Sequence, residues 1–194
     1  MTEADHPQDE SALAPKASSP PRKAVEWLVI IAVAVLVAVL LRAFVLQTFF
    51  IPSASMEPTL QIGDRIIVSK LSYKLHGIHR GDMIVFARPP AENCGGEPVA
   101  DLVKRVIGLP GETIASQGND VLINGKPITQ DWQSKGSPLG PPIRSQRIPN
   151  NAVFVMGDNR TNSCDSRMWG PVNQSLVVGH VVLRIWPISQ FHVF

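Results

Sequence analysis

Residues 102–111, Leu-Val-Lys-Arg-Val-Ile-Gly-Leu-Pro-Gly, decide the expected fold because they join a strand pattern to a turn. Successive side chains of a β-strand point to opposite faces of a sheet, so Leu102, Lys104 and Val106 share one face. The Gly-Leu-Pro-Gly sequence at residues 108–111 supplies residue types that favour a tight turn. This stretch therefore predicts a strand that ends in a turn and belongs to an antiparallel sheet.

Short apolar runs bounded by turn-forming residues recur on both sides of this stretch. They lie at residues 64–68, 82–86, 121–123, 152–156 and 176–186. Asn124-Gly125 follows the third run, and this dipeptide is typical of a two-residue β-hairpin. No second long helical pattern is visible, so we expect a mainly β fold, an antiparallel β-sheet domain over residues 48–194. Residues 130–149 show little apolar pattern, and we expect a surface excursion there.

The longest apolar segment, WLVIIAVAVLVAVLLRAFVL, lies upstream of these strands at residues 27–46. Its apolar side chains cover every face of a helix. About 20 helical residues rise roughly 30 Å, the thickness of a bilayer core. We therefore expect a transmembrane helix over residues 24–47, with a buried core helix as the alternative. No small-x-small cleavage site follows Arg42, which favours an anchor over a cleaved leader.

The rest of the composition narrows the function classes. Residues 1–23 are rich in proline, serine and acids without an apolar period, so we expect a disordered tail. Lys16, Arg22 and Lys23 precede the apolar segment, which favours a cytoplasmic amino terminus and an external β domain. The net charge of +2, without Lys/Arg clusters near aromatics, gives no case for nucleic-acid binding. The two cysteines have neither zinc-site nor disulfide-scaffold spacing.

Residues 51–60, Ile-Pro-Ser-Ala-Ser-Met-Glu-Pro-Thr-Leu, contain the first candidate for chemistry. Two prolines favour an extended, exposed turn in which Ser53 and Ser55 share a face. A nucleophilic serine needs a base. Lys104 has apolar neighbours on its strand face, and burial lowers the pKa of lysine toward the range of a general base. The alternatives are a turn-forming serine and a lysine that extends from a strand edge to solvent.

The five histidines are weaker candidates for the base. His76 and His79 have a spacing found at metal sites, but no helix holds them and no third ligand is near in sequence. His180 falls in a late strand, while His6 and His192 lie near the chain ends. We expect solvated loop histidines and no metal site.

A second polar block, Gly-Asp-Asn-Arg-Thr-Asn-Ser-Cys-Asp-Ser-Arg, follows an apolar strand at residues 157–167. These residue types build loops that bond to their own backbone. We expect Asp165 and Arg167 to pair across a turn, and we expect the loop to contribute to a site at the strand end. A purely structural loop is the alternative.

Taken together, these segments resemble the type I signal peptidases, the Ser/Lys proteases of bacterial export. The blocks that carry the resemblance are, in order, the apolar span, Ser-Met-x-Pro-Thr-Leu at 55–60, Arg-Gly-Asp at 80–82, Lys-Arg-Val-Ile-Gly-Leu-Pro-Gly at 104–111 and the block at 157–167. The resemblance implies a serine endopeptidase that removes signal peptides from exported preproteins after small-x-small sites. It also implies a place at the outer face of the plasma membrane, in contact with lipid, without metal or cofactor.

The resemblance further implies a role for each matching position. Ser55 would attack the scissile carbonyl and Lys104 would take its proton. Ser53 and the Ser55 N–H would form the oxyanion hole, and Ser163 would hold the Lys104 amine. The substrate pocket would be lined by Phe49, Ile51, Pro52 and Met56, and the supporting loop would contain Asp158, Asp165 and Arg167.

Two features depart from the family pattern or leave alternatives open. Residues 111–148 form a short segment, so we expect the second β region to be reduced to a hairpin or two. Cys94 and Cys164 form either a disulfide outside the cytoplasm or two unpaired thiols. A self-cleaving repressor-type Ser/Lys protease is disfavoured by the apolar span and by the lack of a DNA-binding helix pair. A membrane-tethered binding protein would leave the ordered blocks unexplained.

Overall fold

The computed structural model describes residues 22–95, 99–133 and 136–194. The chain divides into two units, Met1–Val39 and Leu40–Phe194. Most of the predicted disordered tail, residues 1–21, lies outside the described part, whereas Arg22 and Lys23 belong to the first helix.

The apolar segment is helical. Helix α1 (Arg22–Phe44) exposes its apolar side chains between residues 25 and 39 on all sides. Across the described residues, no helix combines the length and the apolar character that a membrane crossing requires. The transmembrane anchor over residues 24–47 stays a prediction. Its predicted last residues lie beyond the helix, because strand β1 (Leu46–Phe50) pairs with the sheet from Leu46 onward.

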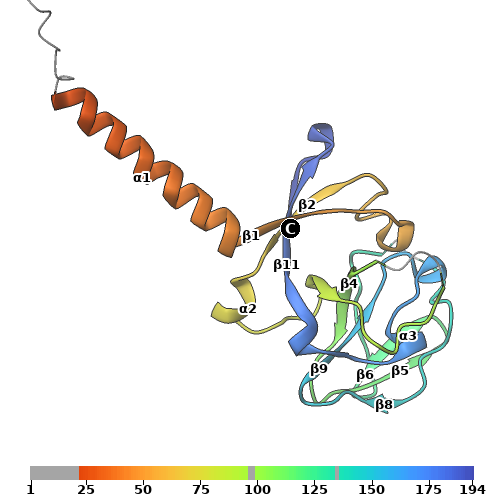
Figure 1. Ribbon diagram of the computed structural model, residues 1–194. Coiled ribbons are helices and arrows are strands. Elements are labelled where there is room, and N and C mark those ends of the chain that lie inside the picture. Colours follow the sequence, from red (N-terminus) through yellow and green to blue (C-terminus); the bar gives the residue numbers. More distant parts are fainter. Residues whose placement is uncertain (1–21, 96–98, 134–135) are drawn as a thin grey trace, which may run out of the picture. The chain divides into compact units, whose positions relative to one another are not determined.

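Among the described residues, the main sheet has eight strands, and neighbouring strands always run antiparallel (Figure 1). The order is β1-β2-β11-β3-β4-β9-β10, and β12 pairs with β11. The strands after β1 are β2 (Arg65–Ser69), β3 (Met83–Ala87), β4 (Asp101–Gly108), β9 (Ala152–Met156), β10 (Val172–Asn173), β11 (Val177–Trp186) and β12 (His192–Val193). The predicted mainly β fold is confirmed.

A second sheet of four strands has the order β7-β6-β5-β8. Its strands are β5 (Thr113–Gln117), β6 (Asp120–Ile123), β7 (Lys126–Pro127) and β8 (Gln146–Arg147). Asn124 and Gly125 join β6 to β7 with φ angles of 50° and 79°, the left-handed pair that a tight hairpin turn needs. The predicted hairpin and the small second β region are therefore present.

Six short helical segments were missed by the sequence patterns, because a single turn has no apolar period to detect. They are η1 (Ala54–Met56), α2 (Ser72–Leu75), η2 (Arg160–Asn162), α3 (Ser166–Trp169), η3 (Gln174–Leu176) and η4 (Ile188–Gln190). Segment η1 lies inside the serine-containing block at residues 51–60, η2 lies inside the polar block at residues 157–167, and α3 begins at the end of that polar block.

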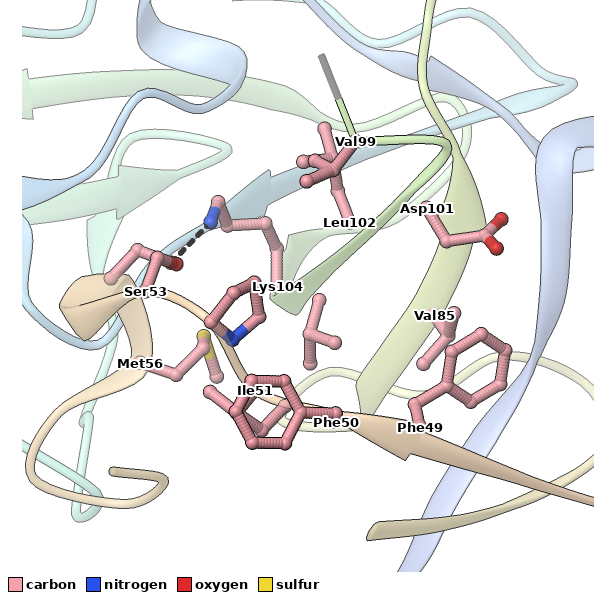
Figure 2. Close-up of a pocket in the computed structure, with 13 residues that line it drawn as sticks. Phe49, Phe50, Ile51, Ser53, Met56, Val85, Val99, Asp101, Leu102 and Lys104 are labelled. Atoms are coloured by element: carbon pink, nitrogen blue, oxygen red, sulfur yellow. Dashed lines mark hydrogen bonds between the residues drawn. The ribbon is translucent and has the colours of Figure 1, made fainter. Parts of the chain in front are cut away.

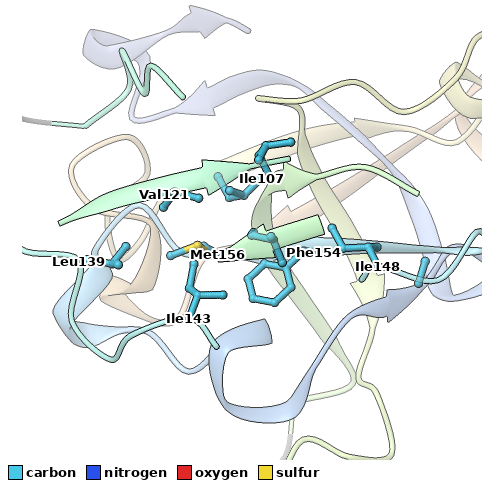
Figure 3. Close-up of a cluster of buried hydrophobic side chains, with 10 residues drawn as sticks. Ile107, Val121, Leu139, Ile143, Ile148, Phe154 and Met156 are labelled. Carbon is cyan, nitrogen blue, oxygen red and sulfur yellow. The ribbon is translucent and has the colours of Figure 1, made fainter. Parts of the chain in front are cut away.

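One hydrophobic cluster joins the two sheets (Figure 3). It combines side chains of β4 and β9 with side chains of β5 and β6, together with Leu139, Ile143 and Ile148. These last three are 2%, 4% and 0% exposed, so the prediction of a surface excursion over residues 130–149 was wrong for this part. Their irregular spacing hid them, since buried residues in an irregular segment follow no fixed period.

A second cluster holds the serine-containing segment in place. Ile51, Met56 and Leu60 are buried with side chains of β2, β3 and β11. Backbone bonds between Ile51 and Asp64 and between Leu60 and Met56, both 2.9 Å, close the segment into a compact loop. Ser55 is therefore displayed by a loop that is anchored on both sides in the core.

Close strand packing around Gly179 gives a stability prediction. A Cβ at Gly179 would lie under 3.0 Å from the Ser69 carbonyl, and Ser69 is itself paired in β2. We expect Gly179→Ala to lower the free energy of unfolding by about 2 kcal/mol or more in guanidinium denaturation. Gly77→Ala is the control, because no atom lies within 4 Å of its Cβ position. Equal stability of the two variants would contradict the packing argument.

Candidate active site

Ser55 and Lys104 meet although 49 residues separate them in the chain. The Lys104 Nζ atom donates a hydrogen bond of 2.6 Å to Ser55 Oγ. Figure 2 shows Lys104 at this site, with a dashed line that starts at its amine. Ser55 lies in η1 and Lys104 in the middle of β4. Both are buried, with 9% and 4% of their surface exposed. A serine hydroxyl and a lysine amine at this distance have the geometry of a nucleophile and its base.

The surroundings of Lys104 favour its neutral form. Burial is the largest effect, and it lowers the pKa of Lys104 from 10.5 to about 8. The carboxylates of Asp165 and Asp158 oppose this effect, while the Arg167 guanidinium adds to it. Desolvation disfavours a buried ammonium, so the Lys104 amine loses its proton closer to neutral pH than an ordinary lysine does.

Ser53 lies next to the pair but is exposed. Its Oγ atom is 3.4 Å from Ser55 Oγ, and its extended backbone leads into η1. Together with Ser55 and Lys104 it borders two adjoining cavities. The three polar side chains therefore face space that a peptide can reach.

The narrower cavity has a volume of about 60 Å³. The four predicted pocket residues Phe49, Ile51, Pro52 and Met56 all line it (Figure 2). Sequence reasoning missed the other residues that line it, which are Phe50, Val85, Val99, Asp101, Leu102 and Val103. Leu102 was already placed on the strand face of Lys104, so a signal for one of these residues was present in the alternation.

The loop after β9 is built around a buried ion pair. Arg167 donates to both carboxylate oxygens of Asp165, at 2.8 and 2.7 Å, and both side chains are fully buried. Asp165 also accepts from the Gly157 N–H at 3.0 Å and caps α3. The expected pair across the turn is present, and two parallel bonds give it a defined geometry.

A second buried ion pair joins several sequence blocks at Arg105. Arg105 lies on the opposite side of β4 from Lys104 and donates to both oxygens of Asp158, at 2.8 and 2.6 Å. It also donates to the Gly81 carbonyl at 2.7 Å, and Thr59 donates to Asp158 at 2.6 Å. Sequence reasoning missed this role of Arg105, because its partners are distant in the chain.

Ser163 is half-buried, and its buried hydroxyl oxygen has no hydrogen-bond partner among the described residues. The predicted contact with the Lys104 amine is therefore not formed in this structure. Ser163 lies against Gly157, where an added Cβ would collide with Ser163 Oγ and the Ser55 carbonyl. A glycine at this position is what allows Ser163 and Ser55 to approach each other.

Three of the histidines lie near one another, around Asp82. His76 and His79 are exposed, as predicted. His180 joins them through Asp82, whose carboxylate lies 3.9 Å from His79 Nδ1 and 3.9 Å from His180 Nε2. Burial lowers the pKa of His180, and Asp82 opposes this effect. None of the three has a hydrogen bond to Ser55 within the described residues, which leaves Lys104 as its neighbour.

Cys94 and Cys164 form a disulfide with a Cα–Cα distance of 6.2 Å. This resolves the alternative between a bridge and two thiols. Glu92 lies beside them, and in the described part of the chain these three form the group of side chains close enough to share a metal ion. The bridge occupies both sulfur atoms, and it borders the larger cavity, of about 460 Å³, next to Ser55.

The sequence is similar to known proteins over the region that contains these blocks. Residues 24–186 match the family model described as signal peptidase, peptidase S26. Signal peptidase I of Leptolyngbya laminosa is 40% identical over 185 residues, which cover 95% of this chain and 89% of that protein. Signal peptidase IB of Staphylococcus aureus is 33% identical, over 88% of this chain and 93% of that protein.

A crystal structure of a signal peptidase I from Enterococcus faecalis V583 also matches, with 30% identity and a TM-score of 0.42. The match covers 54% of this chain and 97% of that chain. The family match spans most of the sequence and includes all the blocks that the sequence analysis singled out. The chain therefore belongs to the peptidase S26 family, the signal peptidase I family of serine endopeptidases.

Proposed function

We propose that this protein removes amino-terminal signal peptides from exported preproteins, with Ser55 as nucleophile and Lys104 as general base. The observation that carries the proposal is the 2.6 Å contact between the Lys104 amine and the Ser55 hydroxyl inside a buried site. Membership of the signal peptidase family supplies the substrate class.

The reaction follows the logic of other serine proteases. The neutral Lys104 amine takes the Ser55 proton while Ser55 Oγ attacks the scissile carbonyl. The resulting oxyanion is stabilised by the Ser53 hydroxyl and the Ser55 N–H. Protonated Lys104 then gives its proton to the leaving amine, and water releases the acyl group by the same steps in reverse order.

Ser163 is proposed to hold the Lys104 amine when the amine is charged. A buried hydroxyl without a partner costs about 1–3 kcal/mol, so Ser163 gains from a nearby donor. A protonated lysine amine has three N–H donors, and one of them is bonded to Ser55 Oγ. Asp158, Asp165 and Arg167 act indirectly, because their ion pairs hold the loop that contains Ser163.

The narrow cavity supports cleavage after small-x-small sites. Phe49, Ile51, Pro52 and Met56 give it a mostly apolar wall next to Ser55. Its volume of about 60 Å³, against about 460 Å³ for the adjoining cavity, favours a small side chain before the cut. An apolar wall of this kind binds small aliphatic groups by excluding water from them.

We further propose that residues 24–47 anchor the protein in the plasma membrane, with the tail of residues 1–23 cytoplasmic and the peptidase domain of residues 48–194 on the outer face. The support is the apolar composition of the segment and the exposure of its side chains along α1. Apolar side chains exposed on every face of a helix are suited to lipid rather than to water.

The dyad is tested by cleavage of a preprotein with an Ala-x-Ala site. Full-length wild type in detergent is expected to cut at that site, whereas Ser55→Ala and Lys104→Ala are expected to lose at least about a thousandfold in rate. Mass spectrometry of the products locates the cut. Cleavage by Lys104→Ala at the wild-type rate would show that another group is the base.

The pH dependence of kcat/KM tests the protonation state of Lys104. The amine accepts a proton only when neutral, so the rate is expected to rise with pH up to an inflection near 8. Below the inflection, each pH unit lowers kcat/KM about tenfold. An inflection near 6.5, the ordinary pKa of histidine, would instead point to an imidazole base.

The same burial predicts a stability cost. The pKa of Lys104 lies near 8 in the folded state and at 10.5 as an ordinary lysine, so below pH 8 the folded protein bears a buried charge. We expect Lys104→Met to raise the free energy of unfolding at pH 7 by about 2 kcal/mol. This figure already subtracts the hydrogen bond to Ser55 that the variant loses. The gain should diminish between pH 8 and pH 10.5. Lys126→Met, at an exposed site, is the control, and a Lys104→Met gain independent of pH would contradict the argument.

A further inference from the structure

Asn159 bonds to the nucleophile segment through both its side chain and its backbone. Its Nδ2 atom donates to the Ala54 carbonyl at 3.1 Å, and its N–H donates to the Ser55 carbonyl at 3.1 Å. Asn159 is separated from Ala54 by 105 residues. These two bonds thus join the loop after β9 to the two peptide groups on either side of the Ser55 Cα atom.

The bond to Ala54 acts on a particular peptide group. The Ala54 carbonyl and the Ser55 N–H belong to the same peptide unit, which is planar. Holding the oxygen of this unit therefore sets the direction in which the N–H on its other side points. The Glu57 N–H also donates to the Ala54 oxygen, at 3.1 Å, so two donors fix the plane.

The side chain of Asn159 does not cap the helical turn that follows it, although its position favours a cap. Asn159 precedes η2, where an asparagine side chain commonly accepts a bond from the helix backbone. No such cap bond forms here, and the amide reaches across to Ala54 instead. Its neighbours are held independently, since Asp158 pairs with Arg105 and Gly157 bonds to Asp165. The direction of the Asn159 side chain is therefore well determined.

We propose that Asn159 is a positioning residue for the oxyanion hole, because its amide orients and polarises the Ala54–Ser55 peptide that supplies the Ser55 N–H. This inference rests on the proposed function, in which Ser55 attacks the substrate carbonyl. A hydrogen bond to a carbonyl oxygen strengthens the N–H of the same peptide as a donor, through cooperative polarisation. The effect is largest when negative charge develops on the substrate oxygen, that is, in the transition state.

The kinetic consequence differs from that of a structural or substrate-binding residue. Loss of the Asn159 amide leaves the Ser55 N–H in place but less well directed. We therefore expect a fall in kcat of about tenfold to a hundredfold, less than the loss of a whole oxyanion donor. KM should stay within about threefold, because the interaction is made in the transition state.

The experiment compares wild type, Asn159→Asp and Asn159→Ala as full-length proteins in detergent, with an Ala-x-Ala preprotein as substrate. Asn159→Asp keeps the size and shape of the side chain but replaces the donor by an acceptor. Asn151→Ala is the matched control, since Asn151 is exposed in the turn before β9. Cleavage by wild type and its absence in Ser55→Ala establish the proposed function separately.

A peptide aldehyde with the same small-x-small sequence adds a readout that a structural role would not change. Ser55 Oγ bonds to the aldehyde carbon, the hydroxyl proton passes to Lys104, and the carbonyl oxygen becomes the oxyanion. We expect both Asn159 variants to bind the aldehyde about tenfold to a hundredfold more weakly, in proportion to their loss of kcat. Their affinity for the corresponding peptide amide should match that of wild type, and so should the pH inflection of the uncharged variant Asn159→Ala.

Two results would overturn the inference. One is wild-type kcat in both Asn159 variants. The other is an equal loss of affinity for the aldehyde and for the peptide amide together with a lower thermal midpoint, which would assign Asn159 to folding alone. Failure of the wild type to cleave, or cleavage by Ser55→Ala, would instead reject the proposed function on which the inference depends.

Discussion

The buried contacts of Arg105 connect the parts of this active site. The guanidinium binds Asp158, the Gly81 carbonyl and the Thr59 hydroxyl, which lie in three separate sequence blocks. Arg105 itself belongs to the fourth block, on β4. Removing one partner of a buried ion pair typically costs about 3–5 kcal/mol, because the other charge is left unpaired. The serine loop, the turn before β3 and the loop after β9 are therefore held to one strand by a single side chain.

The alternation of β4 then places the proposed base, Lys104, next to Ser55. Arg105 faces the ion pair on one side of the strand, so its neighbour Lys104 faces the serine on the other. Burial of Lys104 stabilises its neutral form, which the chemistry needs, although the same burial reduces the stability of the fold below pH 8. The buried amine therefore lowers the stability of the fold at the position where the proposed reaction requires a base.

Much of the fold could be predicted from local patterns, and most of what was missed depends on contacts between distant segments. Apolar runs located β2, β3, β4, β6, β9 and β11, Asn124-Gly125 located the hairpin, and Lys104 was placed on an apolar face of its strand. The buried residues near Leu139 were missed because they have no period. Arg105 was missed because its partners lie 24 to 53 residues away. The predicted bond between Ser163 and Lys104 is absent from the described contacts, since resemblance alone does not determine rotamers.

The proposed reaction depends most on the Lys104 amine losing its proton near pH 8 instead of near 10.5. The direct measurement is a pH titration of the full-length protein carrying ¹³C-labelled lysine, with the Lys104 Cε resonance assigned by comparison with Lys104→Met. The account predicts an inflection for this resonance near pH 8, well below those of the exposed lysines. An inflection near 10.5 would mean that the amine stays charged beside Ser55 and does not act as its base.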